Sequence, residues 1–357
     1  MHDTIMTLPE IDCVIIGVNC SSTLEACIDS VRSSDYPQEK LHLYYVDGGS
    51  TDSSILVAGQ CTGVETISLD HEHPTPGAGR NAGWRAGSSP FVQFLDSDTI
   101  VDEKWLKQGV ETIAANDALG AVFGRRNEMH PESSVFNWIG ELEWNPVAGE
   151  SDCFGGDVLI RRESLERSGG YDEILVGGED PELSRRIIRG GWRIVHIDLP
   201  MTRHDLAMKT VSQYLRRAFR SGYGFAAVRI REARCGSAFW SYHLKKIEVK
   251  GGGFLCCAAL ALLLPFAGSS PILYLLSSIM AAIGTVLLLT PRLFRVDKFM
   301  QELRLDRNSA RRYAWHCSLV VLPQLFGVIR FHAGFLLGRP LCNRRKSLRT
   351  NLSNTAS

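Results

Sequence analysis

The front of the chain alternates continuous apolar runs with segments whose apolar residues recur every three or four positions. Residues 12–18 have the length and composition of a central strand in a parallel sheet that helices cover on both faces. A helix is expected next, because Ser22 and Glu25 have capping-box spacing. Further strands are predicted at 41–46, 64–69, 91–95, 118–123 and 193–199, and further helices at about 80–86 and from residue 103. This alternation predicts an α/β sandwich that opens with nucleotide-binding βαβ units.

The back of the chain has a different pattern, with three long apolar segments at about 254–267, 272–289 and 319–337. The first two, joined by a turn at 268–271, are predicted to form a hairpin (about 254–289) across a bilayer. The third contains Pro323, Arg330 and His332, which favour a re-entrant or interfacial segment over a spanning one. An apolar helix in a soluble core is the alternative for each segment. We therefore predict two domains, at 1–235 and 236–357.

The charges are divided between the same two regions. Residues 1–200 carry 15 basic and 33 acidic side chains, which leaves 39 − 15 = 24 basic and 39 − 33 = 6 acidic ones in the remainder. A basic region that also holds long apolar runs indicates anionic lipid headgroups as its partner, and argues against nucleic acid. Basic residues flank the predicted hairpin at 245, 246 and 250 and at 292, 295 and 298. Both ends of the hairpin are therefore expected in the cytosol.

Two further features of the sequence support a cytosolic location. The ten cysteines have irregular spacing without a CxxC pair, as is typical of reduced thiols. The first residues lack a basic stretch followed by a long apolar one, so no signal peptide is predicted. We expect a cytoplasmic catalytic domain anchored at the inner (plasma) membrane.

Candidate chemistry begins with Asp96-Ser97-Asp98, which follows the strand at 91–95. The carboxyl ends of strands form the edge where open α/β sheets bind ligands. Two carboxylates there suit a divalent metal, Mn²⁺ or Mg²⁺, that would neutralise the diphosphate of a nucleotide-activated substrate. Taken alone the triplet is equally an acidic turn, so its meaning depends on the residues around it.

Together with its neighbours, the triplet resembles the corresponding motif of family 2 glycosyltransferases, which invert the sugar and have a GT-A fold. The resemblance covers about residues 10–235 and includes the strand ending at Asn19, the segment 45–52 and the Arg-Asn helix start at 79–83. It implies that Asp47 contacts the nucleoside, with Gly48 in place of a second carboxylate. It also implies that Arg80 lies near the donor, and that Asp96 and Asp98 bind donor and metal.

The resemblance continues through 154–156, 160–162 and 169–173 to Glu179-Asp180. It implies that Asp180 is the catalytic base, which takes the proton of the acceptor hydroxyl. The local sequence also suits Asp180 as a helix N-cap, because Pro181 follows it. His204 matches a position where relatives place a histidine near the diphosphate or the metal. A structural histidine is the alternative there.

These features predict a membrane-anchored inverting glycosyltransferase of cell-surface polysaccharide or glycolipid synthesis. Its donor would be a nucleotide sugar, and the family resemblance favours a UDP-sugar. Its acceptor would be a molecule near the membrane, such as a lipid-linked sugar. The segment 125–152, with Trp138, Glu141 and Trp144, is a candidate acceptor region. His71 and His73 are interpreted as loop residues.

Three alternatives remain. Residues 213–217 resemble a motif of processive polysaccharide synthases, but Arg217 stands where the motif has tryptophan. A metal-dependent nucleotidyltransferase would be expected to carry a basic phosphate-gripping loop after the first strand, and residues 17–21 contain no lysine or arginine. A degenerate, non-catalytic membrane scaffold is disfavoured by the carboxylates that the motifs retain.

Overall fold

The computed structural model of this chain describes residues 8–70 and 73–342. It divides into two compact units, with residues 208–341 in the second and the remaining described residues in the first. The division comes earlier than the boundary expected after residue 235, because the helix Val211–Arg234 packs with the helices of the second unit.

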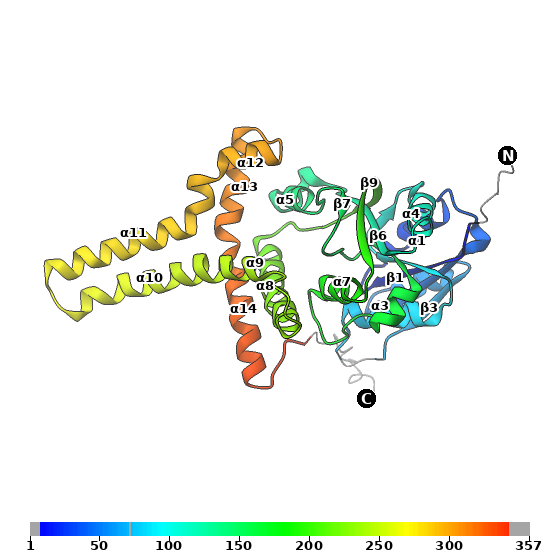
Figure 1. Ribbon diagram of the computed structural model, residues 1–357, viewed down its shortest axis with the longest axis horizontal. Coiled ribbons are helices and arrows are strands. Elements are labelled where there is room, and N and C mark those ends of the chain that lie inside the picture. Colours follow the sequence, from blue (N-terminus) through cyan, green and yellow to red (C-terminus); the bar gives the residue numbers. More distant parts are fainter. Residues whose placement is uncertain (1–7, 71–72, 343–357) are drawn as a thin grey trace, which may run out of the picture. The chain divides into compact units, whose positions relative to one another are not determined.

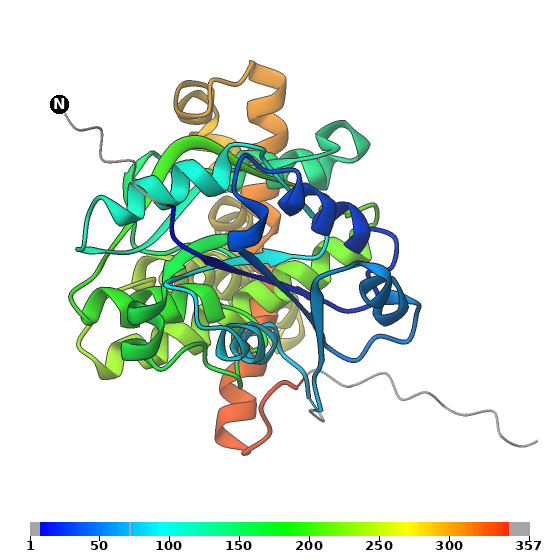
Figure 2. The ribbon, with the colours of Figure 1, turned by 90° about the vertical axis from the view of Figure 1, so that its right-hand side faces the viewer.

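A nine-stranded mixed sheet forms the centre of the first unit (Figure 1). Its strand order is β3-β2-β1-β4-β8-β6-β9-β5, and β7 pairs with β9. The strands from β3 to β4 are parallel, whereas β8 is antiparallel to both its neighbours. Their bounds are β1 Ile11–Gly17, β2 Leu41–Asp47, β3 Val64–Ser68, β4 Phe91–Asp96, β5 Thr99–Val101, β6 Leu119–Glu128, β7 Gly149–Glu150, β8 Val158–Arg161 and β9 Arg193–His204. Figure 2 shows the twist of this sheet.

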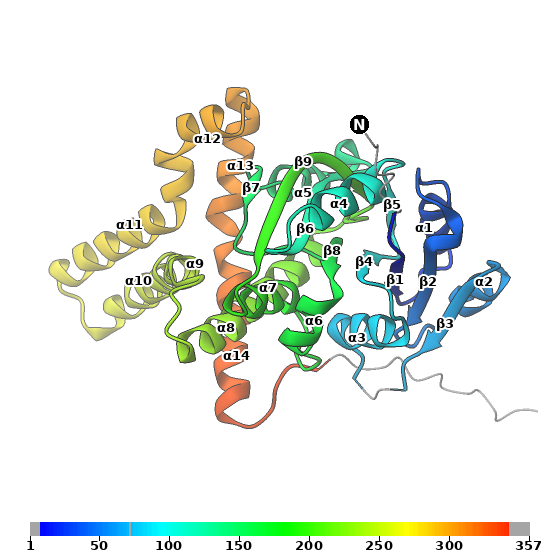
Figure 3. The same cartoon turned by 45° about the vertical axis from the view of Figure 1, so that its right-hand side comes forward.

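Helices cover both faces of the sheet (Figure 3). They are α1 Leu24–Arg32, α2 Ser54–Gln60, α3 Pro76–Ala86, α4 Trp105–Ala114, α5 Val135–Glu143, α6 Arg162–Ser168 and α7 Glu179–Arg189, with short 3₁₀ turns at Gln38–Lys40 and Pro131–Ser133. In α3, Gly83 packs against Val14 of β1, whereas Trp105 of α4 donates to Gln93 of β4 on the other face. The predicted α/β sandwich is confirmed.

Two predicted helix caps are wrong. Helix α1 has Thr23 as its N-cap residue, and no side-chain hydrogen bond caps it. The Thr23 hydroxyl instead donates to the Cys20 carbonyl, so the capping box expected at Ser22 does not form. Helix α7 begins at Glu179, after Gly178 in the left-handed conformation (φ 87°). Asp180 therefore lies inside the first turn instead of at the N-cap.

The second unit consists of helices. They are α8 Val211–Arg234, α9 Ser241–Ile247, a π-helical turn Glu248–Gly252, α10 Gly253–Leu263, a 3₁₀ turn Leu264–Ala267, α11 Pro271–Phe294, α12 Val296–Glu302, α13 Arg307–Leu319 and α14 Val321–Leu336. Helices α10 and α11 pair as the predicted hairpin, in which Gly284 lies against Cys257 and the Ser277 hydroxyl donates to the Ala261 carbonyl.

Three helical stretches of the described residues are long and apolar enough to cross a membrane: Ser241–Ala267, Pro271–Glu302 and Arg307–Leu336. The first is longer than the apolar segment at 254–267, because α9 continues through the π-helical turn into α10. Length and composition thus allow three spans where the sequence suggested two.

The tight packing of α3 on the sheet gives a testable expectation. A Cβ atom at Gly83 would collide with the Val14 side chain and lie 3.1 Å from Val46. We expect Gly83→Ala to lower the free energy of unfolding by about 1–3 kcal/mol, the usual cost of overpacking. The matched control is Gly59→Ala in α2, where a Cβ would meet nothing within 4 Å. That variant should be neutral or more stable in the same thermal unfolding measurement, and equal losses in both would contradict the packing argument.

Candidate metal and donor site

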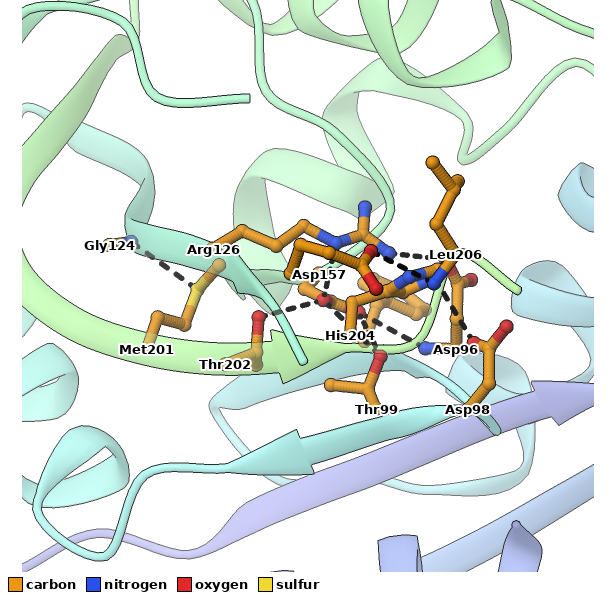
Figure 4. A network of polar contacts seen from close by, with 12 residues as sticks. Asp96, Asp98, Thr99, Gly124, Arg126, Asp157, Met201, Thr202, His204 and Leu206 are labelled. Atoms are coloured by element: carbon orange, nitrogen blue, oxygen red, sulfur yellow. Dashed lines mark hydrogen bonds and ion pairs between the residues drawn. The ribbon is translucent and has the colours of Figure 1, made fainter. Parts of the chain in front are cut away.

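The site forms where the chain leaves the middle of the sheet for its edge. Asp96 ends β4, Ser97 and Asp98 turn, and β5 then pairs antiparallel with β9, so that Thr99 lies opposite His204. Strand β9 extends to His204, five residues beyond the predicted end. One ligand atom from each of Asp96, Asp98 and His204 lies within 4.8 Å of the others (Figure 4). The three residues predicted as metal ligands are therefore brought together.

Within this cluster, His204 faces Asp98 most closely. Its Nε2 atom lies 3.1 Å from Oδ1 of Asp98 and 4.0 Å from Oδ2 of Asp96. The His204 side chain is buried, whereas that of Asp98 is 41% exposed. Asp98 thus presents its carboxylate toward solvent, where an arriving ligand can reach it.

The Asp96 carboxylate is held by two arginines. Its Oδ1 lies 3.0 Å from Arg80 Nη2 and its Oδ2 lies 3.1 Å from Arg126 Nη2. Burial alone would raise the pKa of Asp96, but the two guanidinium groups hold that pKa at about 2. Asp96 is therefore an anion at any physiological pH, with an internal cation on each oxygen.

Arg126 was not singled out in the sequence. It lies on β6, pairs through Nε with Oδ2 of Asp157 at 3.2 Å, and places its guanidinium 5.1 Å from the centre of the Trp144 ring. The Trp144 ring also meets the His204 ring edge to face at 5.3 Å. Trp144, predicted as an acceptor-stacking residue, thus packs on the arginine and the histidine of the site.

Asp157 was also missed, although it directly follows the motif glycines. Its buried carboxylate accepts hydrogen bonds from the Asp96 backbone N–H (3.1 Å) and the Thr202 hydroxyl (2.9 Å). Burial raises the pKa of Asp157, and Arg126 opposes that shift. Asp157 ties the start of β8 to the ends of β4 and β9, as Figure 4 shows.

Arg80 connects the metal-ligand cluster to the predicted base. It is 2% exposed, lies 5.4 Å from the Tyr171 ring centre, and reaches Glu179 at 3.1 Å and Asp180 at 3.4 Å through Nη1. Burial raises the pKa of Asp180 to about 8, while Arg80 lowers it and Glu179 adds to the rise. Asp180 thus takes up a proton near neutral pH, as a general base requires.

Two predicted site residues make hydrogen bonds to nearby strands and loops of the protein. Asp47 is buried and accepts from the Tyr45 hydroxyl and from the backbone N–H groups of Gly49 and Ser50, at 2.9–3.0 Å. Glu141 accepts from Asn127 and from the Glu128 backbone N–H. Asp47 orders the loop that follows β2, and Glu141 connects α5 to the end of β6. His71 lies outside the described residues.

The donor set fits a divalent cation. Carboxylate oxygens suit Mg²⁺ and Mn²⁺, and an imidazole nitrogen extends the range toward Mn²⁺ and other transition metals. The Nδ1 atom of His204 is buried without a hydrogen-bond partner among the described residues, and it would carry the ring proton if the Nε2 lone pair bound a cation. Asp98 and His204 are the residues best placed to hold the ion, because both oxygens of Asp96 already meet arginines.

Residues 12–167 match the family model described as glycosyl transferase family 2. This part of the chain is similar to that family, which confirms the resemblance inferred from the sequence. The match contains Asp47, Arg80 and the Asp96-Ser97-Asp98 triplet, on which the resemblance was based. It ends before Asp180 and His204.

Curated relatives from three organisms are glycosyltransferases or act in polysaccharide synthesis by name. Glycosyltransferase AglE of Haloferax volcanii is 25% identical over 226 residues, 61% of this chain and 73% of AglE. The pre-mycofactocin glycosyltransferase of Mycobacterium tuberculosis is 28% identical over 58% of this chain and 46% of its own length. The succinoglycan biosynthesis protein ExoA of Rhizobium meliloti is 27% identical over 51% and 58%. The chain spans about half the length of the last two.

A solved structure confirms the fold. The mannosyltransferase PcManGT from Pyrobaculum calidifontis, in complex with GDP-Man and Mn²⁺, matches with a TM-score of 0.57 and 17% identity over 89% of this chain and 88% of that one. At this identity the likeness supports the GT-A-type architecture alone.

The metal cluster leads to a binding experiment. We expect Mn²⁺ to raise the unfolding temperature of the wild type, since a ligand that binds only the folded state stabilises it. Asp98→Asn and His204→Ala should each weaken the Mn²⁺ affinity by roughly 10- to 100-fold or more, at least the cost of losing a group that only orients a ligand. His73→Ala is the control and should titrate like the wild type. A wild-type affinity in His204→Ala would remove that residue from the ligand set.

The close approach of Gly156 to the charged cluster gives a second experiment. A Cβ atom there would lie 2.7 Å from Arg80 Nη2 and 2.8 Å from Asp96 Oδ2, whereas one at Gly155 would meet nothing within 4 Å. We expect Gly156→Ala to lose about 1–3 kcal/mol of stability and most of the Mn²⁺ response, because the ion pair must shift. Gly155→Ala should keep both. Equal stability and equal Mn²⁺ response in the two variants would show that the Arg80–Asp96 ion pair can shift without cost.

Proposed function

We propose that the protein is an inverting glycosyltransferase that transfers one sugar from a nucleotide-sugar donor to an acceptor hydroxyl, with Asp180 as the base. The observation that carries the proposal is the chain of contacts Asp98–His204, Asp96–Arg80 and Arg80–Asp180, which links a cation-binding cluster to a buried carboxylate of raised pKa. Such a pairing suits displacement of a diphosphate by a deprotonated hydroxyl.

The reaction divides between two ends of this chain of contacts. A divalent cation held by Asp98 and His204 would supply positive charge for the diphosphate as it leaves. At the other end, Asp180 takes the proton from the acceptor hydroxyl, whose oxygen bonds to the anomeric carbon opposite the departing oxygen. Arg80 holds the base in place from within the protein, so the predicted direct contact of Arg80 with the donor is not needed for this mechanism.

The donor is proposed as a nucleotide sugar, with uridine diphosphate as the carrier that family habit favours. The bound GDP-Man of PcManGT makes guanosine diphosphate the competing carrier to test. The name of ExoA supports a place in polysaccharide synthesis. The apolar helices support a membrane-anchored enzyme with a membrane-near acceptor, lipid-linked sugars first among them, and with the catalytic unit in the cytoplasm.

Transfer of a single sugar is proposed over processive synthesis because Arg217 stands where the synthase motif has tryptophan, and Gln213 of the same segment caps a helix. Its side chain completes a capping box with Thr210 at the start of α8, where Gln213 Oε1 accepts from the Thr210 backbone N–H at 2.9 Å. The segment that resembled a synthase motif thus begins with a helix cap. Analysis of the product length with a short acceptor distinguishes the two modes.

The base assignment predicts a selective loss. We expect Asp180→Asn to lower the transfer rate by roughly 10²- to 10⁴-fold, the usual contribution of a general base, with unchanged donor affinity. The variant should be at least as stable as the wild type at pH 8, since it removes a carboxylate whose ionisation burial opposes. The control is Asp198→Asn, whose exposed carboxylate pairs with Arg125. Unchanged transfer in Asp180→Asn would exclude it as the base.

The raised pKa also predicts the pH dependence. Only the ionised carboxylate accepts a proton, so kcat should rise with pH and level off above an apparent pKa no higher than about 8. A bound cation nearby stabilises the anion and shifts that limb toward lower pH. The residual kcat of Asp180→Asn should not show this rise with pH. If the rise persists in the variant, another group is responsible for it.

A further inference from the structure

The second unit contains three candidate spans, and the packing of its helices indicates which of them cross the membrane. The apolar windows of the first two spans are 6% and 11% buried within the protein, whereas that of Arg307–Leu336 is 33% buried. The hairpin therefore has almost its whole surface free to meet lipid. The third candidate already has a protein partner, which is α8.

Helices α8 and α14 pack with their backbones in close contact. A Cβ atom at Gly222 of α8 would collide with the Gln324 backbone, and one at Gly327 of α14 would collide with the Phe219 carbonyl. The Tyr214 hydroxyl lies 2.9 Å from Nδ1 of His316 in α13. From the Tyr214–His316 contact to the Tyr223–Phe331 contact, whose ring centres lie 5.2 Å apart, residue numbers rise in both partners, so α13 and α14 run in the same general direction as α8. A glycine contact on each side leaves no room for lipid between them.

Helix α8 cannot accompany α14 through a bilayer. It carries six arginines, and Arg216, Arg217 and Arg220 in its first half are exposed. Each arginine at the centre of a bilayer costs about 2.5–3.5 kcal/mol on insertion scales. Because α14 is bound along this helix, crossing would require either those costs or the loss of the packed interface.

The hairpin meets this pair in its middle. Gly251, where the first hairpin helix begins its apolar part, lies against Val321, and Arg292 at the end of α11 lies 5.8 Å from the Trp315 ring. Both ends of the hairpin thus stand on one short stretch between α13 and α14. Figure 1 and Figure 3 show α13 and α14 running crosswise to the hairpin. A hairpin that crosses the bilayer therefore places α13 and α14 along the membrane surface.

The exposed side chains suit such a surface. On α14, Phe326, Ile329 and Leu336 are 53%, 51% and 81% exposed and repeat at helical spacing on the side away from α8. The neighbouring helices expose arginines, which on α13 include Arg311 and Arg312. An apolar stripe beside a row of arginines is typical of helices that lie in the headgroup region of anionic membranes.

We propose that α8, α13 and α14 form a basic platform that lies on the cytosolic surface of the membrane against anionic phospholipid headgroups, and that within the described residues the α10–α11 hairpin alone crosses the bilayer. The inference rests on the proposed membrane anchoring and deepens it. It places the end of α14 on the same side of the membrane as its beginning.

The first test is the side on which residue 342 lies. In full-length protein with its other nine cysteines replaced, Cys342 should react with a membrane-impermeant maleimide in inside-out vesicles and remain unlabelled in right-side-out ones. A matched variant with Ser269→Cys in the hairpin turn, and Cys342 replaced, should show the opposite pattern. Labelling of both in right-side-out vesicles would mean that α14 crosses, and labelling of both in inside-out vesicles would mean that the hairpin does not; either result would overturn the proposal.

A reporter fused to the C-terminus of the otherwise wild-type chain repeats the test if cysteine replacement disturbs folding. A fluorescent protein that matures only in the cytoplasm should be bright, and alkaline phosphatase, active only outside it, should be silent. The reverse result contradicts the platform. Transfer assays on the same vesicles report the proposed function separately, since sugar transfer can fail while the topology holds. A wild-type protein found wholly in the soluble fraction would remove both the anchor and the platform.

The second test measures depth. Spin labels at Phe326→Cys and Leu336→Cys should lie at nearly equal, shallow depth in vesicles of phosphatidylcholine and phosphatidylglycerol. Labels at Leu276→Cys and Val286→Cys, also ten residues apart, should differ by about 15 Å along the bilayer normal if α11 spans. A similar difference within the α14 pair would overturn the proposal. In phosphatidylcholine alone the α14 labels should move outward, and an unchanged depth would contradict the headgroup contact.

Discussion

The Asp96 carboxylate, held between two buried guanidinium groups, is the interaction on which the rest of the site depends. Arg80 reaches it from α3 and Arg126 from β6, and each arginine continues to a second acid, Asp180 and Asp157 respectively. Breaking a buried pair by removing one partner typically costs about 3–5 kcal/mol, because a charge is left uncompensated. Here one carboxylate compensates two charges. Asp96 is therefore a structural centre of the first unit before it is a ligand.

This arrangement explains how two partly buried aspartates of the same site come to differ in pKa. Burial opposes ionisation of both Asp96 and Asp180. Asp96 has an arginine on each oxygen and is held ionised, whereas Asp180 shares a single arginine with Glu179 and Asp96 and has a raised pKa. Environments that separate the pKa values of neighbouring acids are a usual way of assigning their chemical tasks. One acid then serves as a fixed charge and the other as a proton acceptor.

The sequence predicted the parts of this site that belong to local patterns. Strand β4 and its acidic turn were visible because an apolar run ends abruptly in carboxylates, and His204 because a motif places it. Arg126 and Asp157 were missed, since neither occupies a distinctive local position. Arg126 follows another arginine at the end of a strand, as solvent-facing residues often do, and its pairing with Asp96 spans 30 positions. Such contacts depend on the order of strands in the sheet, which apolar periodicity does not encode.

The cap predicted for α7 failed for a related reason. Pro181 and the apolar positions after it indicated a helix with Asp180 as its N-cap, whereas the helix begins two residues earlier than that cap implies, at Glu179. The difference arises from Gly178, which adopts a left-handed conformation and lets the helix begin at Glu179. Glu179 and Asp180 both then lie in the first turn, near the positive end of the helix dipole. The shift by two residues brings two acids to Arg80 where the sequence suggested one.

In the second unit, hydropathy likewise describes each helix alone and does not encode its packing partners. An apolar window says whether a helix tolerates hydrocarbon when it is alone, and by that measure α10, α11 and α14 are alike. They differ in their partners: α10 and α11 pack on each other through small residues, which leaves a uniformly apolar exterior, while α14 packs on a helix that carries arginines. Since a helix enters a bilayer together with whatever is bound to it, the least apolar member of a packed pair decides where both can reside. The close contacts of Gly222 and Gly327 hold α8 and α14 together as a single packed pair. The arginines of α8 therefore determine where α14 can lie, although α8 and not α14 carries them.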